Sequence, residues 1–167
     1  AESSANAAGN YGCQLWIDTT IPTKEGANVY VASSNLTLLS SECRSIIARL
    51  KMQDFSALFT VVHGPHAGSG EATEADHFWE ELELSIEKHR RRSDTLTVLS
   101  DASAQNPFNR PTSIAHASPF TGFTQSIGVS GATTKDGDTS DEAKLHTYHG
   151  NVSACQLDYI ALDARAE

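Results

Sequence analysis

Short runs of alternating apolar and polar residues mark several segments of the chain, and each predicts a strand with one buried face. Residues 12–20 and 28–32 are two such runs. Residues 43–52 fit either a strand or a helix. We favour the strand, because Asp54 then forms a turn that joins it to the apolar run at residues 56–63 as a hairpin.

A different spacing marks residues 73–91, where apolar side chains recur every three or four positions and predict a helix. The apolar positions are Phe78, Trp79, Leu82 and Ile86. Acidic residues come early in this segment, and the basic residues Lys88 and Arg90–Arg92 come late. That order complements the helix dipole. The apolar run at residues 95–99 follows directly, so strand, helix and strand succeed one another and predict an α/β fold.

The second half of the chain is rich in Ser, Thr, Gly, Asp and Asn between residues 102 and 143. A structureless loop of that length is uncommon in a compact domain, so we expect a short helix or strand around residues 120–127. Residues 145–149 and 156–162 are predicted to form a closing pair of strands.

Composition narrows the functions that such a fold could serve. The chain has 167 residues, for which we expect a flexible segment at residues 1–11 and one domain at residues 12–167. The formal net charge of −9 argues against binding nucleic acid through charge alone, because phosphate contacts need Lys and Arg. An enzyme that reaches phosphate through a bound divalent metal is compatible with this charge.

The sequence predicts a soluble chain, or else a piece cut from a longer polypeptide. No apolar run is long enough to cross a bilayer, and residues 1–10 lack the basic start and apolar middle of a signal peptide. Cys13, Cys43 and Cys155 fit neither a disulfide framework nor a thiolate metal site. They predict buried thiols in a reducing compartment, and hence an intracellular location, the nucleus included.

Three predicted strands each carry a titratable residue. His63 ends one strand, Asp101 ends another, and Asp158 lies in a third. Strands are rigid places for catalytic groups in α/β enzymes. Phosphodiester hydrolysis needs a base that activates water, an acid for the leaving oxygen and a positive centre such as a carboxylate-bound metal. These three residues are therefore candidate catalytic residues.

Five motifs, in order along the chain, resemble the endonuclease/exonuclease/phosphatase (DNase I-like) superfamily. They are Gly12-Cys-Gln-Leu-Trp-Ile17, Phe59-Thr-Val-Val-His-Gly-Pro-His66, Val98-Leu-Ser-Asp-Ala-Ser-Ala104, His146-Thr-Tyr-His149 and Gln156-Leu-Asp-Tyr-Ile160. The branch they resemble is the endonuclease domain that precedes reverse transcriptase in non-LTR retrotransposons. The resemblance implies a DNase I-like two-sheet β-sandwich flanked by helices (four layers, α/β/β/α) that lacks its first strands.

The same resemblance implies roles for single residues. Asp101 would orient or deprotonate the attacking water, and His63 would lie beside the scissile phosphate. Asp158 would orient its neighbours, while Thr147 matches a threonine of the family. Ser103 stands where the family has an asparagine that holds a phosphoryl oxygen. The implied cofactor is Mg²⁺ or Mn²⁺, and the implied partners are DNA as substrate and a C-terminal reverse transcriptase domain in the full polypeptide.

The chain also departs from the family's pattern. Serine at position 103 lacks an amide donor, and the loss of one such donor typically lowers a rate by about 10²–10³. The family's upstream strand with a metal-binding glutamate has no counterpart, because Glu2 lies in no apolar run, and the terminal Asp-His pair is missing too. We therefore expect an incomplete, partly degenerate endonuclease with weak or no activity.

Two other functions stay open: a non-catalytic remnant of a longer polyprotein that serves as a structural or interaction module, and a phosphatase for a small phosphorylated ligand. The acidic charge suits both better than it suits DNA binding. His63 and His66 with His146 and His149 could form a four-histidine metal site, although zinc sites usually mix ligand types. Arg90–Arg92 could contact phosphate, but a solvated basic helix end explains them more simply.

Overall fold

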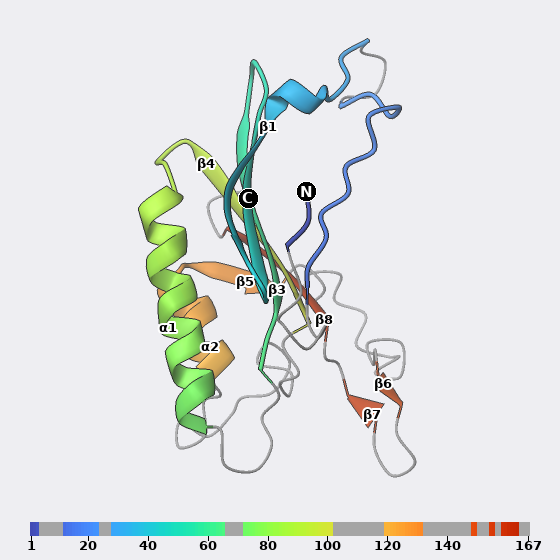
Figure 1. Ribbon diagram of the computed structural model, residues 1–167. Helices are drawn as coiled ribbons and strands as arrows, with labels where there is room; N and C mark the ends of the chain where they lie inside the picture. The colour runs from blue at the N-terminus through green and yellow to red at the C-terminus, as the bar shows by residue number, and fades with distance from the viewer. Residues whose placement is uncertain are drawn as a thin grey trace.

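A six-stranded mixed sheet organises the protein, which we analysed as a computed structural model (Figure 1). The structure describes residues 1–3, 12–23, 28–65, 72–101, 119–131, 148–149, 154–155 and 158–163. The elements are the 3₁₀ helix η1 (Ser33–Asn35), β1 (Leu36–Glu42), β2 (Ser45–Lys51), β3 (Ser56–His63), α1 (Ala72–His89), β4 (Asp94–Asp101), α2 (Pro119–Ser126), β5 (Val129–Gly131), β6 (Tyr148–His149), β7 (Ala154–Cys155) and β8 (Asp158–Asp163).

The first three strands form an antiparallel meander, and the strand order across the sheet is β1-β2-β3-β4-β8-β5. The hairpin of β2 and β3 is the one predicted from the turn at Asp54. β2 is buried on both faces, since Ile46 packs into one apolar cluster and Ile47 into another. This burial on both sides explains why its sequence alternates too weakly to distinguish a strand from a helix.

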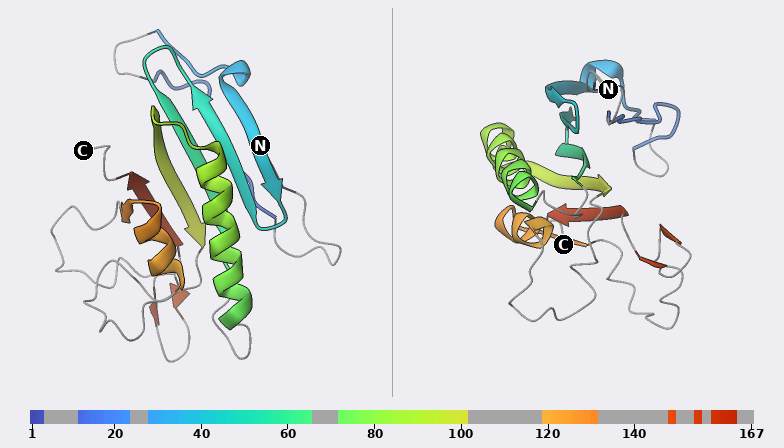
Figure 2. Two further views of the ribbon diagram at one scale, coloured as in Figure 1. Left: turned by 90° about the vertical axis from the view of Figure 1, so that its left-hand side faces the viewer. Right: turned by 60° about the horizontal axis from the view of Figure 1, so that its bottom comes forward.

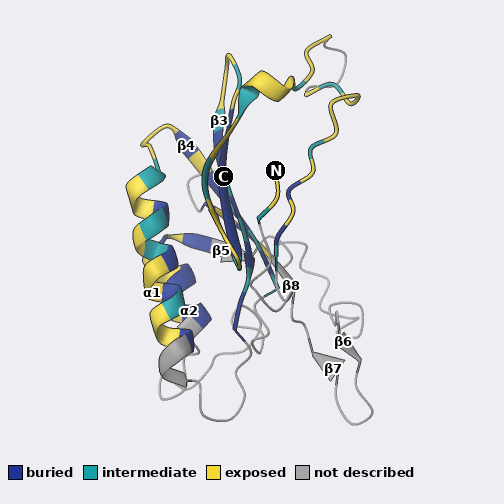
Figure 3. Ribbon diagram, in the orientation of Figure 1, coloured by how far each residue is buried: buried dark blue, intermediate teal, exposed yellow. Residues whose placement is uncertain are grey.

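α1 connects β3 to β4, and these two strands run parallel, which confirms the predicted strand–helix–strand unit. The inner side of α1 is buried and its outer side is exposed (Figure 3). Trp79, Leu82 and Ile86 form the buried side and pack with α2 into the core. α1 and α2 lie side by side on the same face of the sheet (Figure 2).

α2 confirms the element expected around residues 120–127. The helix is followed by Gly128, whose φ of 70° is a conformation that glycine adopts without strain. The amide of Gly128 donates to the Gln125 carbonyl, and the amide of Ile127 donates to the Phe123 carbonyl. The helix therefore ends here, and the chain turns at Gly128 directly into β5.

A buried ion pair fixes the end of α1 to the sheet. Nη2 of Arg49 lies 3.0 Å from Oδ2 of Asp94 and also donates to the His89 carbonyl. Asp94 further accepts hydrogen bonds from the Ser56 hydroxyl at 2.5 Å and the Arg91 amide at 2.9 Å. Burial raises the pKa of Asp94, but these hydrogen bonds together hold it below its usual range.

The N-terminal runs form less sheet than predicted. In residues 12–20 the predicted strand is reduced to one bridge, between Gln14 and Glu2, and in residues 28–32 to one bridge, between Tyr30 and Pro22. The predicted alternation is nevertheless real, since Cys13 and Leu15 are buried and Gln14 is exposed. Burial of one face therefore does not require a full ladder of backbone hydrogen bonds.

The opening residues are held by this same segment. The terminal ammonium of Ala1 donates to the Leu15 carbonyl at 3.0 Å, and the amide of Ser3 donates to the Cys13 carbonyl at 2.8 Å. Residues 4–11, the rest of the segment expected to be flexible, lie outside the described residues.

The prediction that residues 145–149 and 156–162 pair with each other as strands is wrong. β8 is a strand as expected, but it pairs with β4 on one side and β5 on the other. β6 pairs instead with β7, in a small two-stranded sheet set apart from the main one (Figure 1). β8 belongs to the main sheet because its Ala161 is fully buried in the core beneath the helices.

Within the part of the chain that the structure describes, no helix is long and apolar enough to span a membrane.

Candidate catalytic row at the end of the sheet

Three predicted site residues lie at one level on three adjacent strands. His63 ends β3 opposite Asp101, which ends the parallel strand β4. Asp158 begins the antiparallel strand β8 opposite Asp101. At about 4.8 Å between strands, the row from His63 to Asp158 spans about 10 Å of backbone. Residues far apart in the sequence thus meet at one end of the sheet, and we call these three candidate catalytic residues the catalytic row.

The row faces away from the helices. Val62 and Ser100, the neighbours of His63 and Asp101 in each strand, are buried on the helix side. Because successive side chains alternate between faces, His63 and Asp101 lie on the other side, and both are half-buried. Asp158 is placed by its backbone register alone.

The backbone around His63 is fixed on both sides. The His63 amide donates to the Arg44 carbonyl at 2.9 Å, and the Gly64 amide donates to the Asp101 carbonyl at 2.7 Å. β3 is therefore tied to its neighbours up to and just beyond the row. A catalytic group at such a position is held by the sheet rather than by a loop.

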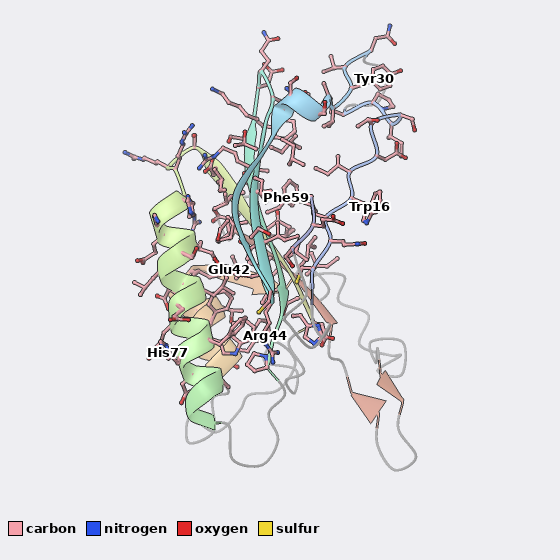
Figure 4. All side chains as sticks on the ribbon, in the orientation of Figure 1. Trp16, Tyr30, Glu42, Arg44, Phe59 and His77 are labelled. Atoms are coloured by element: carbon pink, nitrogen blue, oxygen red, sulfur yellow. The ribbon has the colours of Figure 1, made fainter. Side chains whose placement is uncertain are left out.

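Arg44 is a further candidate site residue, which the sequence analysis did not identify. It lies in the turn between β1 and β2, opposite His63, and Figure 4 shows it at the end of the sheet where β3 stops. Its Nη1 donates to the Gly64 carbonyl at 3.3 Å, and the residue is half-buried. Counting the register outward from the predicted turn at Asp54 would have placed Arg44 opposite His63.

The two cysteines whose side chains the structure describes, Cys13 and Cys43, supply no nucleophile to the row. Cys13 is buried as predicted, and its thiol donates to the Arg44 carbonyl at 3.2 Å. Burial raises the pKa of Cys13, so the thiol stays protonated at neutral pH. Cys43 is exposed, which corrects the prediction of buried thiols, because it occupies the β1–β2 turn. The side chain of Cys155 lies outside the described residues.

Several predicted residues cannot be placed in this row. Ser103, His66, His146 and Thr147 lie outside the described residues, and of His149 only the backbone is described. The structure therefore does not address the four-histidine site. Phe78 and Trp79, by contrast, belong to the core, as their helical spacing indicates.

The described residues do not make up a metal site by themselves. Among them, no group of three or more His, Cys, Asp or Glu residues converges on one point. The row offers two carboxylate-bearing positions, Asp101 and Asp158, on adjacent strands. A hard cation such as Mg²⁺ prefers carboxylate oxygens but would need further ligands here. Glu2, the one acidic residue near the start, is exposed.

No protein-family model and no curated protein matches the sequence. Among solved structures, the endonuclease domain of TRAS1, a telomere-specific non-LTR retrotransposon, superposes with a TM-score of 0.54 at 12% identity, over 86% of this chain and 65% of that one. The fold is DNase I-like. A humanized D. rerio TDP2 superposes with a TM-score of 0.51 at 14% identity, over 78% of this chain and 53% of that one.

The chain thus spans between about half and two thirds of the length of these DNase I-like structures. Of the four layers expected for a DNase I-like sandwich, the described residues supply the helix layer and one six-stranded sheet. The only other named strands among the described residues are β6 and β7, which pair with each other. The sheet face that bears the catalytic row is covered in part by the N-terminal segment, through Cys13 and Leu15.

Proposed function

We propose that the chain is a phosphodiesterase domain that cleaves nucleic acid, with the catalytic row as its active site. The observation that carries the proposal is the register that aligns His63, Asp101 and Asp158 on three adjacent strands. The DNase I-like fold supports it, since the similar structures are an endonuclease domain and a TDP2. At 12–14% identity they support the fold, and the activity is our inference.

The residues of the row suit in-line hydrolysis of a phosphodiester. The Asp101 carboxylate would accept a proton from water as the water oxygen forms its bond to phosphorus. As the bond from phosphorus to the leaving oxygen breaks, the imidazolium of His63 would give that oxygen a proton. The charge that builds on the phosphoryl oxygens needs a fixed positive group, and the guanidinium of Arg44 lies at the level of His63.

Asp158 and Ser103 complete the proposed active site. Asp158, opposite Asp101, would orient the groups around it through its carboxylate. Ser103 follows Asp101 by two positions and would offer a hydroxyl to a phosphoryl oxygen, where the superfamily it resembles has an amide. The shorter side chain leads us to propose that the activity is weak.

We also propose dependence on Mg²⁺ or Mn²⁺, supported by the two carboxylates of the row and by the overall charge of −9. A bound cation would attract the anionic substrate that the protein as a whole repels. More specifically, we propose that the domain is a DNA endonuclease of retrotransposon type. In the full polypeptide it would precede a reverse transcriptase, and the protein would be located in the nucleus. The likeness to the TRAS1 endonuclease domain supports it.

A non-catalytic remnant is the second candidate. Two observations favour it: among the described residues no three metal-ligating side chains converge on one point, and the chain is strongly acidic. In that case the fold would serve as a structural or interaction module with no turnover.

Nicking of supercoiled plasmid separates the two functions. The parent protein, Asp101→Asn, His63→Gln and the exposed control Asp54→Asn are compared with Mg²⁺, with Mn²⁺ and with a chelator. We expect metal-dependent nicking that falls by about 10²–10⁴ in Asp101→Asn and His63→Gln, as for loss of a general base or acid. Asp54→Asn should nick at the parent rate.

The remnant is the better assignment if the parent, folded by circular dichroism, nicks with neither metal. Nicking that survives Asp101→Asn at the parent rate would remove the catalytic row from the mechanism.

A further inference from the structure

A basic feature lies at the opposite end of the sheet from the catalytic row. It is a shallow, open pocket of about 690 Å³ where the ends of α1 and α2 meet, lined by Arg90–Arg92, Glu87, Asp163 and residues 126–128. β4 starts beside this pocket and ends at Asp101, seven residues after Asp94. At about 3.3 Å per residue, the pocket is about 23 Å from the row.

One of the three arginines is rigidly held. Arg90 donates from Nη1 to the Ile127 carbonyl at 2.7 Å and from Nη2 to Oδ2 of Asp163 at 2.6 Å. Its Nε is buried and, among the described residues, has no hydrogen-bond partner. Asp163 is itself buried, so Arg90 neutralises it and the pair leaves no net charge in the pocket.

The side chains of Arg91 and Arg92 have no structural role in the described part of the chain, although the Arg91 backbone amide donates to Asp94. One carbonyl at the end of each helix already has a side-chain donor: Arg49 donates to that of His89, the last residue of α1, and Arg90 donates to that of Ile127, directly after α2. Arg91 and Arg92 are exposed, and their guanidinium groups make no hydrogen bond or ion pair with any described residue. Capping the helices therefore accounts for Arg90 but not for its two neighbours.

Once Arg90 and Asp163 have neutralised each other, the remaining charge of the pocket is positive and favours an anionic ligand. Arg91 and Arg92 carry two positive charges against the single carboxylate of Glu87, in a protein whose net charge is −9. Guanidinium groups bind phosphate and carboxylate oxygens in pairs of parallel hydrogen bonds, and a phosphate group, with a charge of up to about −2, would match both guanidinium charges. We propose that this pocket, the Arg90–Arg92 pocket, binds a phosphate group of a ligand, with Arg91 and Arg92 as its main contacts.

The phosphate could belong to a small phosphorylated molecule or to a nucleic acid strand, and two probes separate these sources. Inorganic phosphate and a 12-nucleotide single-stranded DNA are titrated into the full chain without metal, and the amide NMR signals of Arg91, Arg92 and Gly128 are followed. This readout does not require catalysis, so it holds whether or not the catalytic row is active.

The test variant is Arg91→Gln/Arg92→Gln, which leaves the Arg90–Asp163 pair intact. The control, Lys51→Gln/Lys88→Gln, removes the same charge from two exposed residues outside the pocket. We expect shifts at the pocket amides with at least one probe, and at least a tenfold weaker affinity in the test variant than in the control. Shifts with both probes mean that the phosphate group alone is recognised; shifts with the oligonucleotide alone mean a nucleic acid strand.

The proposal is overturned if neither probe shifts these amides, or if the test and control variants lose affinity equally. The second outcome would show that only overall charge matters.

Discussion

Asp94 is a buried carboxylate that ties three parts of the fold together. It accepts hydrogen bonds from Arg49 in β2, Ser56 in β3 and the Arg91 amide after α1. Replacing it by asparagine leaves the buried guanidinium of Arg49 without a counter-charge, and such a loss costs about 3–5 kcal/mol. We expect the free energy of unfolding of Asp94→Asn to fall by that amount at pH 7.

The effect should depend on pH. The folded protein holds the pKa of Asp94 below its unfolded value, so the stabilisation is complete above the unfolded pKa, about 3.9, and is lost as pH falls through the folded value. Urea unfolding at pH 7, 5 and 3 should show the gap between parent and Asp94→Asn closing toward pH 3. A gap that stays constant, or one of equal size in the exposed variant Asp54→Asn, would contradict this role.

Single residues differ in how far the sequence predicts them. His63 and Asp101 were identifiable because each ends an apolar run, and the parallel pairing of β3 and β4 places them together. Arg44 does not end an apolar run, and only its position opposite His63 in the structure identifies it as a candidate. The role of Arg44 thus depends on register, a property of two strands rather than of one segment.

Among the helices, an aromatic contact joins α1 to α2. The ring of Trp79 lies 5.0 Å, centroid to centroid, from those of Phe120 and Phe123, and only 4% of Trp79 is exposed. Trp79→Ala should lower the free energy of unfolding by about 3–5 kcal/mol through lost burial and a cavity. Trp16→Ala is a matched control, because 83% of Trp16 is exposed, and should change it by less than about 0.5 kcal/mol.

Thermal or urea unfolding followed by circular dichroism gives both values. Equal losses in the two tryptophan variants would mean that the contact between α1 and α2 contributes little to stability.

Helices and hairpins were predicted correctly where the pattern that indicates them lies within one short stretch of sequence. α1 and the β2–β3 hairpin follow from helical spacing and from a turn between adjacent runs. β8 was recognised as a strand but assigned the wrong partner, because it pairs with β4, more than fifty residues earlier in the chain. Residues 12–20 and 28–32 alternate like strands yet form only single bridges, since alternation reports a buried face and not a hydrogen-bonded neighbour.

For the molecule as a whole, the two faces of the sheet are unequally covered. Helices cover one face, while the other exposes Leu38, Ile160 and Leu162 to 49%, 46% and 36%. Exposed apolar surface of this kind promotes association. We expect Leu38→Thr/Leu162→Thr to weaken any self-association of the protein in sedimentation experiments over a range of concentrations. Leu84→Thr, on the exposed side of α1, should leave it unchanged; equal behaviour of the two variants would contradict the expectation.

The place of β8 also affects how the protein is made. β8 is the last of the described strands, yet it lies inside the sheet, between β4 and β5. Asp158 follows Asp101 by 57 positions, so at roughly 5–20 residues per second a ribosome needs about 3–11 s to reach it after Asp101. During that interval β4 has an unpaired edge that can capture a strand of another nascent chain. Synthesis that stalls before Asp158 would therefore leave a product that is both without its catalytic row and prone to aggregate.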